Sequence, residues 1–282
     1  MSKPEDLPDM EYRYLGRSGL QVSAISLGGW LTYGGHVDRE GTYACMKAAY
    51  DAGINFFDCA EGYADGESER VMGEAIKKFG WKRNDLVIST KIYFGAAHGT
   101  RKPNNTGLSR KHILEGITNS LCRLQLDYVD LIYAHRPDRN TPLEETAWRY
   151  ADKLNLIGQQ PRYNLPERQN VERALAHLTS DPSVKLGLTT FSPLKQGILS
   201  GKYKAGGHHI PPNSRFTQTQ LEFIAGFWKR TGKEEFQATV ELVSRLEPIA
   251  AELNISLSVL ALAWVLANPN VSSAITGASS PE

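Results

Sequence analysis

An alternation of short apolar segments with longer amphipathic segments runs along most of the chain and most constrains its fold. The short segments are too brief for helices and are bounded by Gly, Asn or Asp, so they predict buried strands. The longer segments place their apolar residues at helical spacing. Because strand and helix alternate repeatedly, we expect a parallel sheet with helices outside it. The chain has 282 residues, and we expect one domain over residues 1–282.

The element boundaries follow from these periodicities and from residues typical of helix ends. The expected strands cover residues 24–27, 54–58, 86–90, 128–133, 159–163, 186–191 and 271–276. The expected helices cover residues 38–50, 67–76, 109–124, 142–156, 166–178, 234–253 and 256–268. Asp38 and Ser109 are suited to cap the starts of their helices, and Gly53 is suited to end the first helix.

Two irregular segments have a sequence that indicates a role beyond connection. Residues 12–20 contain Gly16 and Gly19, which predict a turn between short extended pieces, and we expect a hairpin that serves as a lid. Residues 93–108 form a long loop rich in Gly, Asn and His. Loops of this length in compact domains are often functional, so we expect a lid on the substrate side.

Composition and charge exclude several classes of function. The formal net charge is +1 and no basic run is present, so we expect no nucleic-acid partner. The three cysteines are widely spaced, which is typical of a reducing compartment. The start of the chain is polar and acidic, and the longest apolar stretch, residues 257–267, is too short to cross a bilayer. We therefore expect a cytoplasmic protein without membrane insertion.

Three familiar ligand-binding patterns are absent or incomplete. No Gly-x-Gly-x-x-Gly follows an expected strand, so a doubly wound dinucleotide fold is not indicated. Residues 197–202 are one residue short of a P-loop, and Tyr203 follows in place of Ser or Thr. His208 and His209 lack Asp, Glu or Cys at ligand spacing, so we expect no metal site.

Ionisable side chains follow three neighbouring expected strands at the points where the strands end. Asp58 ends the second strand, and Tyr63 lies five residues on in a glycine-containing loop. Lys91 and His135 follow the next two strands. Any one of these residues is more often a cap or a solvated side chain. The carboxyl ends of parallel strands meet at one rim, however, so four complementary groups there predict a catalytic site.

Several motifs together resemble the aldo-keto reductases, and within them the branch related to voltage-gated potassium channel β subunits. The motifs are Asp58-x-Ala-Glu-x-Tyr63-x-x-Gly-x-Ser-Glu69, Ser89-Thr-Lys91, Ala134-His-Arg-Pro-Asp138, Ser26-Leu-Gly-Gly-Trp30, Phe191-Ser-Pro-Leu194, Gly201-Lys-Tyr203 and Ile275-Thr-Gly-Ala-Ser279. They extend over nearly the whole chain. The resemblance implies an α/β fold of the eight-stranded (β/α)8 TIM-barrel type, NADPH as cofactor, and reduction of a carbonyl group.

The resemblance also implies a role for each residue at the strand ends. Hydride arriving at a carbonyl carbon develops negative charge on oxygen, which a positioned acid neutralises. Tyr63 is expected to be the proton donor, with its pKa lowered by the ammonium group of Lys91. Asp58 is expected to pair with Lys91 and keep it charged, and His135 to orient the substrate oxygen.

A second group of residues is implied to bind the cofactor. The ring of Phe191 is expected to stack on the nicotinamide, and Arg215 suits a 2′-phosphate because its guanidinium contacts two oxygens at once. The complete expected set is Gly29, Trp30, Asp58, Gln160, Phe191, Ser192, Pro193, Leu194, Lys202, Arg215, Gly277 and Ser279.

The sequence departs from the family pattern in two places. One expected strand lies between His135 and Phe191, whereas relatives have two, and the region after Thr146 passes directly into residues 147–152. The absent strand normally has a Ser-Arg or Ser-Asn pair that binds the nicotinamide amide. Relatives also continue past the position of Glu282 with a further helix. We therefore expect a barrel that lacks one βα unit and the C-terminal helix.

Two classes of function are open at this point. The retained Asp58, Tyr63, Lys91 and His135 favour an NADPH-dependent reductase of a small aldehyde or ketone. The absent strand favours a catalytically impaired NADP-binding module, which would act as a regulatory subunit within a homo-oligomer or with a channel-type partner.

Overall fold

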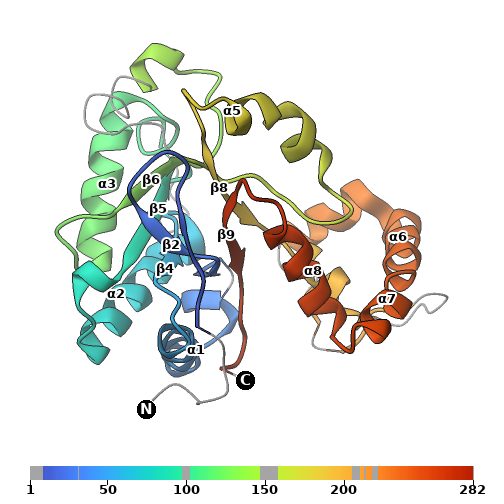
Figure 1. The fold of residues 1–282 in the computed structure, drawn as a ribbon. Coiled ribbons are helices and arrows are strands. Elements are labelled where there is room, and N and C mark those ends of the chain that lie inside the picture. Colours follow the sequence, from blue (N-terminus) through green and yellow to red (C-terminus); the bar gives the residue numbers. More distant parts are fainter. Residues whose placement is uncertain are drawn as a thin grey trace.

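Seven parallel strands form one sheet in the order β6-β5-β4-β3-β9-β8-β7, with helices outside it (Figure 1). The strands are β3 (Ile25–Gly28), β4 (Phe56–Asp58), β5 (Val87–Ile92), β6 (Leu131–Ala134), β7 (Gly158–Gln159), β8 (Gly187–Phe191) and β9 (Val271–Thr276). The computed structural model describes residues 9–30, 32–96, 102–146, 158–204, 210–212, 214–217 and 222–281. This architecture confirms the expected TIM-type barrel with one strand fewer than eight.

The barrel wall is continuous from β6 round to β7 and is open between those two strands. The last strand, β9, pairs with the first, β3, and with β8, which closes the opposite side. Within the described ranges, no strand lies between β6 and β7. All six residues of β5 are buried, whereas only Leu131 of β6 is buried and both residues of β7 are partly exposed. We call this opening the β6–β7 seam. It lies where the sequence analysis expected one strand of the barrel to be missing.

The helices follow the strands as the sequence indicates. They are α1 (Arg39–Asp51), α2 (Glu67–Phe79), α3 (Arg110–Leu124), α5 (Ala176–Ser180), α6 (Glu222–Ser244), α7 (Glu247–Glu252) and α8 (Leu257–Leu266). Both expected N-caps are confirmed, because Asp38 accepts from the Gly41 N–H and Ser109 accepts from the His112 N–H. Gly53 follows α1 with φ of +89°, a conformation that a side chain would strain.

The expected hairpin is also present, and it covers the end of the barrel at which the strands begin. β1 (Tyr12–Tyr14) pairs antiparallel with β2 (Gln21–Ser23). Leu15 and Val22 pack against Phe56, Val87 and Leu131, which are the first residues of β4, β5 and β6. The hairpin is therefore a lid at the amino ends of the strands, opposite the end where Asp58 lies.

Several expected boundaries were wrong, two of them in the second half of the chain. The helix expected over 166–178 is replaced by η4 (Asn170–Ala174) and the short α5. The helix expected over 234–253 is two helices, because α6 begins at Glu222 and ends at Ser244, and α7 has Pro248 in its first turn. The strand expected over 128–133 begins at Leu131.

Parts of other expected elements lie outside the described residues. These parts are residues 147–156 of the helix expected over 142–156, residues 97–101 of the expected loop, and His208 with His209.

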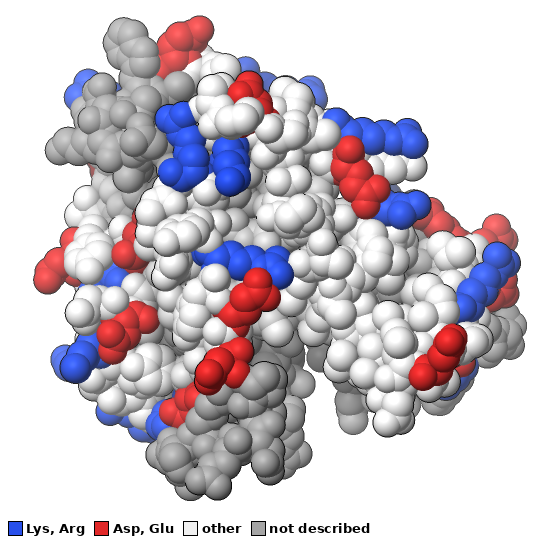
Figure 2. Space-filling view, in the orientation of Figure 1, with Lys and Arg blue, Asp and Glu red and all other residues white. Residues whose placement is uncertain are grey.

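Two surface properties bear on the expected classes of function. Among the described residues, no single helix is long and apolar enough to cross a membrane. One bent helix pair, Thr231–Glu252 with Leu257–Leu266, reaches the required length and apolar composition only when its two parts are taken together. Figure 2 shows acidic and basic side chains interspersed on the face displayed rather than gathered by sign.

The β6–β7 seam leads to a prediction about stability. We expect a variant lengthened between Thr146 and Gly158 by one strand and its helix to melt at a higher temperature than this chain. Each buried backbone group that gains a partner contributes about 1–3 kcal/mol, and each kcal/mol raises Tm by about 2–4 °C for a chain of this size. Differential scanning calorimetry measures the shift. An insertion of equal length made of Gly and Ser is the control, and an equal Tm for both insertions would contradict the prediction.

Candidate active site

Asp58 and Lys91 form a buried ion pair inside the barrel. Strand register places Asp58 beside Ser89, and Lys91 lies two residues further along β5, so both side chains point to the same face of the sheet. Lys91 Nζ lies 2.6 Å from Asp58 Oδ2 and 2.7 Å from the Cys59 carbonyl oxygen. The Asp58 and Lys91 residues are 3% and 2% exposed. The expected pairing of the two is confirmed.

The second carboxylate oxygen of Asp58 is also satisfied. Ser89 Oγ donates to Asp58 Oδ1 over 2.6 Å, and Gln160 Nε2, just beyond β7, donates to the same atom over 2.9 Å. These donors satisfy the buried carboxylate oxygen and fix its orientation. Gln160 was expected to bind the cofactor, and the structure places its amide nitrogen on Asp58 from across the barrel.

The ion pair keeps Lys91 protonated despite its burial. Burial by itself lowers the pKa of the Lys91 ammonium, but the charges of Asp58 and Tyr63 and the hydrogen bonds to them outweigh burial, so the pKa is raised. A protonated lysine is therefore fixed at the rim of the barrel across the pH range in which proteins function.

Tyr63 lies next to that ammonium group on a tight turn. It begins η2 (Tyr63–Gly66), in which Ala64 and Asp65 have positive φ and Gly66, at φ +88°, leads into α2. Lys91 Nζ lies 4.6 Å from the centre of the Tyr63 ring. Burial raises the pKa of Tyr63 more than Lys91 lowers it, so the expected net lowering was wrong, although the direction of the Lys91 contribution was right.

His135 completes the group of four beside Tyr63. The two rings meet edge to face, with centroids 5.6 Å apart and an interplanar angle of 78°. Burial, followed by the nearby charges of Lys91 and Arg136, lowers the pKa of the imidazole to about 3, so His135 is neutral. Its Nδ1 is buried without a hydrogen-bond partner among the described residues. A neutral imidazole of this kind can contact a substrate oxygen without competing for the proton.

The residues expected to bind the cofactor lie at the carboxyl ends of β3, β8 and β9. Gly29 and Trp30 follow β3, and Gly29 has no room for a side chain, because a Cβ would meet the Tyr33 ring and Ser68 Oγ. The others that the structure describes in full are Phe191, Ser192, Pro193, Leu194 and Lys202 after β8, and Gly277 and Ser279 after β9. Arg215 begins η6 (Arg215–Thr217), and its side chain lies outside the described residues.

The loop after β8 has features that fit a dinucleotide phosphate. Ser192, Lys195, Gln196 and Gly197 all have positive φ, and a Cβ on Gly197 would lie 3.1 Å from Lys202 Nζ. An unusual backbone with an ammonium group against it is a suitable environment for phosphate oxygens.

Sequence reasoning missed one member of the site, Ser89, and one contact of an expected member, Gln160. Ser89 could have been found, because it precedes Lys91 by two residues in a strand and so points to the same face. The contact of Gln160 with Asp58 joins residues 102 positions apart and has no local signal.

Comparison with known proteins agrees with these motifs. A model of the aldo/keto reductase family matches residues 24–159 and 149–282. The chain belongs to the aldo/keto reductase family. The two matched segments of this aldo/keto reductase overlap over residues 149–159, and this overlap follows β6 and ends with β7.

Curated relatives cover nearly the whole chain. A "Probable voltage-gated potassium channel subunit beta" of Oryza sativa subsp. japonica is 44% identical over 301 residues, covering 96% of this chain and 88% of the relative. A "Putative voltage-gated potassium channel subunit beta" of Schizosaccharomyces pombe is 45% identical over 312 residues, covering 99% and 87%. Both alignments are longer than the 282 residues of this aldo/keto reductase, so the alignments contain gaps in this chain relative to the two relatives.

The buried ion pair leads to a prediction about folding. We expect Asp58→Ala to destabilise the protein by about 3–5 kcal/mol, because it leaves the Lys91 ammonium buried without its anionic partner, with hydrogen bonds to the Cys59 carbonyl and to Tyr63 remaining. Lys91→Met should cost less, since Asp58 keeps the Ser89 and Gln160 donors. Urea unfolding measures both. The double variant should be more stable than Asp58→Ala alone, and the opposite order would contradict this account.

Proposed function

We propose that this aldo/keto reductase is an NADPH-dependent reductase of aldehydes or ketones with Tyr63 as proton donor. The observation that supports the proposal best is the buried Lys91–Asp58 pair beside Tyr63, with the neutral His135 ring edge to face with the phenol. Family membership supports oxidoreductase chemistry, and the carbonyl class follows from the residues at the strand ends.

The residues of the chain have complementary tasks in such a reaction. The reduced nicotinamide, when bound, supplies hydride to the carbonyl carbon. Tyr63 gives its hydroxyl proton to the carbonyl oxygen, so that the alcohol forms and a tyrosinate remains. Because burial raises the pKa of Tyr63, the donor keeps its proton until the reaction requires it. Lys91, held charged by Asp58, stabilises the tyrosinate, and His135 orients the oxygen.

NADPH is the proposed cofactor because the family resemblance would put cationic residues of this chain at its adenosine end. Phe191 would contact the nicotinamide, and Lys202 and Arg215 would hold phosphate groups together with Ser192, Gly277 and Ser279. Lys202 against Gly197 supports this arrangement.

The first test replaces the proposed donor. Tyr63→Phe should lower the rate of aldehyde reduction by about 10²–10⁴-fold, the usual contribution of general acid catalysis, and should leave NADPH binding unchanged. Steady-state kinetics and fluorescence titration measure the two effects. Tyr33→Phe is the matched control, because Tyr33 is also a buried tyrosine near Asp58 and its hydroxyl has no hydrogen-bond partner in the described part of the chain. A Tyr63→Phe variant with parental turnover would rule out this donor.

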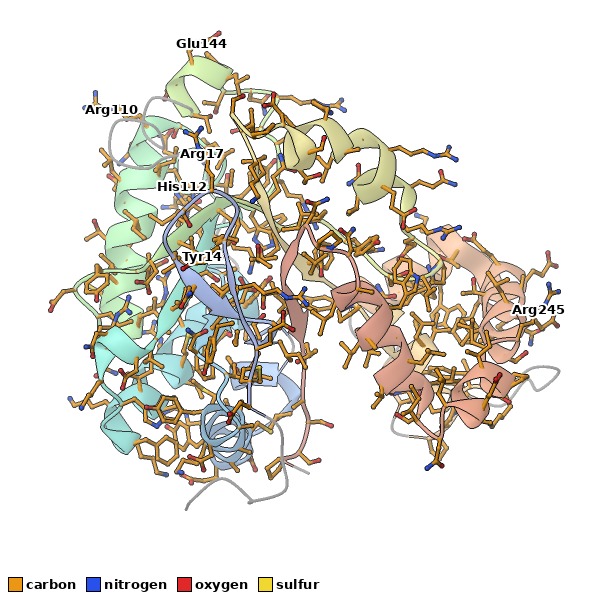
Figure 3. All side chains as sticks on the ribbon, in the orientation of Figure 1. Tyr14, Arg17, Arg110, His112, Glu144 and Arg245 are labelled. Atoms are coloured by element: carbon orange, nitrogen blue, oxygen red, sulfur yellow. The ribbon has the colours of Figure 1, made fainter. Side chains whose placement is uncertain are left out.

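The second test concerns the choice of cofactor. We expect NADPH to bind more tightly than NADH, because the 2′-phosphate gains charge-assisted hydrogen bonds from cationic side chains. Arg215→Ala should narrow the difference, whereas Arg245→Ala, on a helix end remote from β8 (Figure 3), should not. Titration of intrinsic fluorescence gives the dissociation constants. Equal constants for the two cofactors in the parent protein would contradict the proposal.

A second candidate function is an NADP-binding regulatory subunit with little turnover. The names of the relatives and the β6–β7 seam favour it. Binding of NADPH without measurable reduction of any aldehyde or ketone would support this function over the first.

A further inference from the structure

Glu61 is a buried acid in the same motif as Asp58 and Tyr63, and the proposed chemistry does not use it. It is 1% exposed, and its backbone N–H donates to the Lys91 carbonyl oxygen over 3.2 Å. Its side chain is directed away from the Asp58–Lys91 pair toward the segment that follows β5. A buried carboxylate is costly unless its oxygens accept hydrogen bonds, so the partners of Glu61 indicate what it does.

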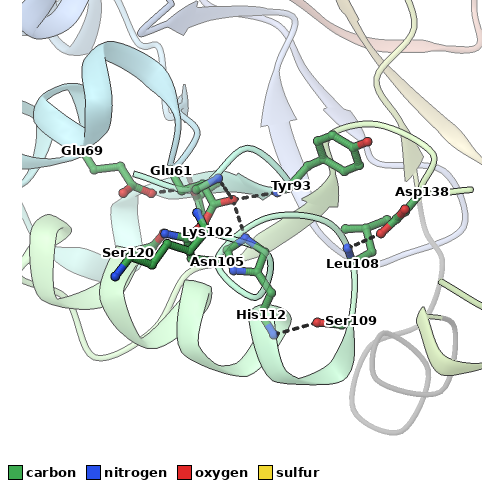
Figure 4. A network of polar contacts seen from close by, with 12 residues as sticks. Glu61, Glu69, Tyr93, Lys102, Asn105, Leu108, Ser109, His112, Ser120 and Asp138 are labelled. Carbon is green, nitrogen blue, oxygen red and sulfur yellow. Dashed lines mark hydrogen bonds and ion pairs between the residues drawn. The ribbon is translucent and has the colours of Figure 1, made fainter. Parts of the chain in front are cut away.

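The carboxylate of Glu61 holds the turn that follows β5. The backbone N–H groups of Tyr93 and Gly95 donate to Glu61 Oε1 over 2.7 and 2.9 Å. His112 Nε2, on α3, lies 3.1 Å from the same oxygen (Figure 4). Gly116, one turn further along α3, makes room for the other oxygen, since a Cβ there would lie 3.0 Å from Glu61 Oε2. Hydrogen bonds to a charged acceptor are about twice as strong as neutral ones.

This turn positions a ring that contacts His135. Phe94 lies between Tyr93 and Gly95, whose N–H groups donate to Glu61. Its ring meets the His135 ring edge to face, with centroids 5.0 Å apart. Gly62 provides space for Phe94, whose Cβ would lie 3.0 Å from a Cβ at that glycine. Phe94 and Tyr63 both meet the imidazole edge to face, at interplanar angles of 81° and 78°.

Asp138 holds the other end of the same loop. It accepts from the Leu108 N–H over 2.8 Å and from the Thr141 hydroxyl over 2.7 Å, and these bonds lower the pKa of its carboxyl group. The Gly107 N–H donates to the Tyr93 carbonyl oxygen over 2.7 Å, which joins the two ends. Two acids from two motifs therefore fix the described parts of the loop that leads from β5 to α3.

We propose that Glu61 is a positioning residue that fixes the Tyr93–Gly95 turn, so that Phe94 holds the His135 ring in the orientation that receives a carbonyl oxygen. This inference rests on the proposed reductase function. It assigns part of the binding of the carbonyl substrate to a residue that touches neither that substrate nor the cofactor. Its effect should therefore fall on the aldehyde or ketone and leave NADPH unaffected.

Glu69 provides the matched control. It is a second fully buried acid of the same motif, and it accepts from the Thr90 hydroxyl over 2.5 Å and from Arg123 Nε over 2.6 Å. These contacts join β5, α2 and α3 on the outside of the barrel and do not include the Tyr93–Gly95 turn. Loss of Glu69 therefore reproduces the loss of a buried carboxylate without releasing Phe94.

The kinetic test compares Glu61→Ala, Glu61→Gln and Glu69→Ala. Glu61→Ala should lower kcat/KM for an aldehyde by about 10–100-fold, mainly through KM, because a misplaced orienting group loses productive geometry. The NADPH dissociation constant should not change. Glu61→Gln keeps an acceptor oxygen and should recover most of the loss, and Glu69→Ala should keep the parental KM. An unchanged KM in Glu61→Ala, or an equal rise in Glu69→Ala, would overturn the proposal.

A second measurement does not depend on turnover. The ring-proton resonances of His135, assigned in the holoprotein with a His135→Asn variant, report the ring current of Phe94. They should move in Glu61→Ala and remain in place in Glu69→Ala. If the parent reduces no carbonyl compound, the proposed function fails while this result still decides the positioning role. If Glu61→Ala does not fold, Phe94→Leu, which removes the ring, should itself move the His135 resonances and raise KM for the aldehyde. A stationary His135 resonance in the folded variant would overturn the proposal.

Discussion

The buried ion pair of Lys91 and Asp58 is the interaction on which the rest of the site depends. The two charges are tolerated inside the barrel because both groups are hydrogen-bonded. Ser89 and Gln160 donate to the carboxylate, and the ammonium donates to the Cys59 carbonyl oxygen. The pair joins β4, β5 and the residue after β7. It therefore contributes both the charge beside Tyr63 and a link across the barrel interior.

The strands and their ends were predictable from the sequence because local rules determine them. β9 occupies the expected residues, and the caps at Asp38 and Ser109 follow from side-chain oxygens that accept the first N–H groups of a helix. Lys91 and His135 could be assigned to one rim because parallel strands align their carboxyl ends. The net pKa shift of Tyr63 could not be predicted, since it depends on how much protein surrounds the phenol.

The second half of the chain was less predictable for physical reasons that its residues make clear. Pro248 begins a new helix within a segment whose apolar periodicity is continuous, and Gly232 breaks α6 with a positive φ. The contact of Gln160 with Asp58 and that of Tyr133 with Thr189, 2.9 Å between their oxygens, depend on the closure of the barrel and on no local pattern. Glu61 was quoted within a motif, and only its partners in space reveal its position under the Tyr93–Gly95 turn.

The β6–β7 seam has a consequence for how the molecule opens locally. Among the described residues, β6 pairs with β5 alone, whereas β5 is held on both sides by β4 and β6. Amide hydrogens of β6 can therefore exchange with solvent through a partial unfolding that leaves β4, β5 and their ion pair intact. His135 follows β6 directly, so one of the two edge strands of the sheet presents the imidazole. In this molecule the motion of a single edge strand would be felt at the rim of the barrel while β4 and β5 stay paired.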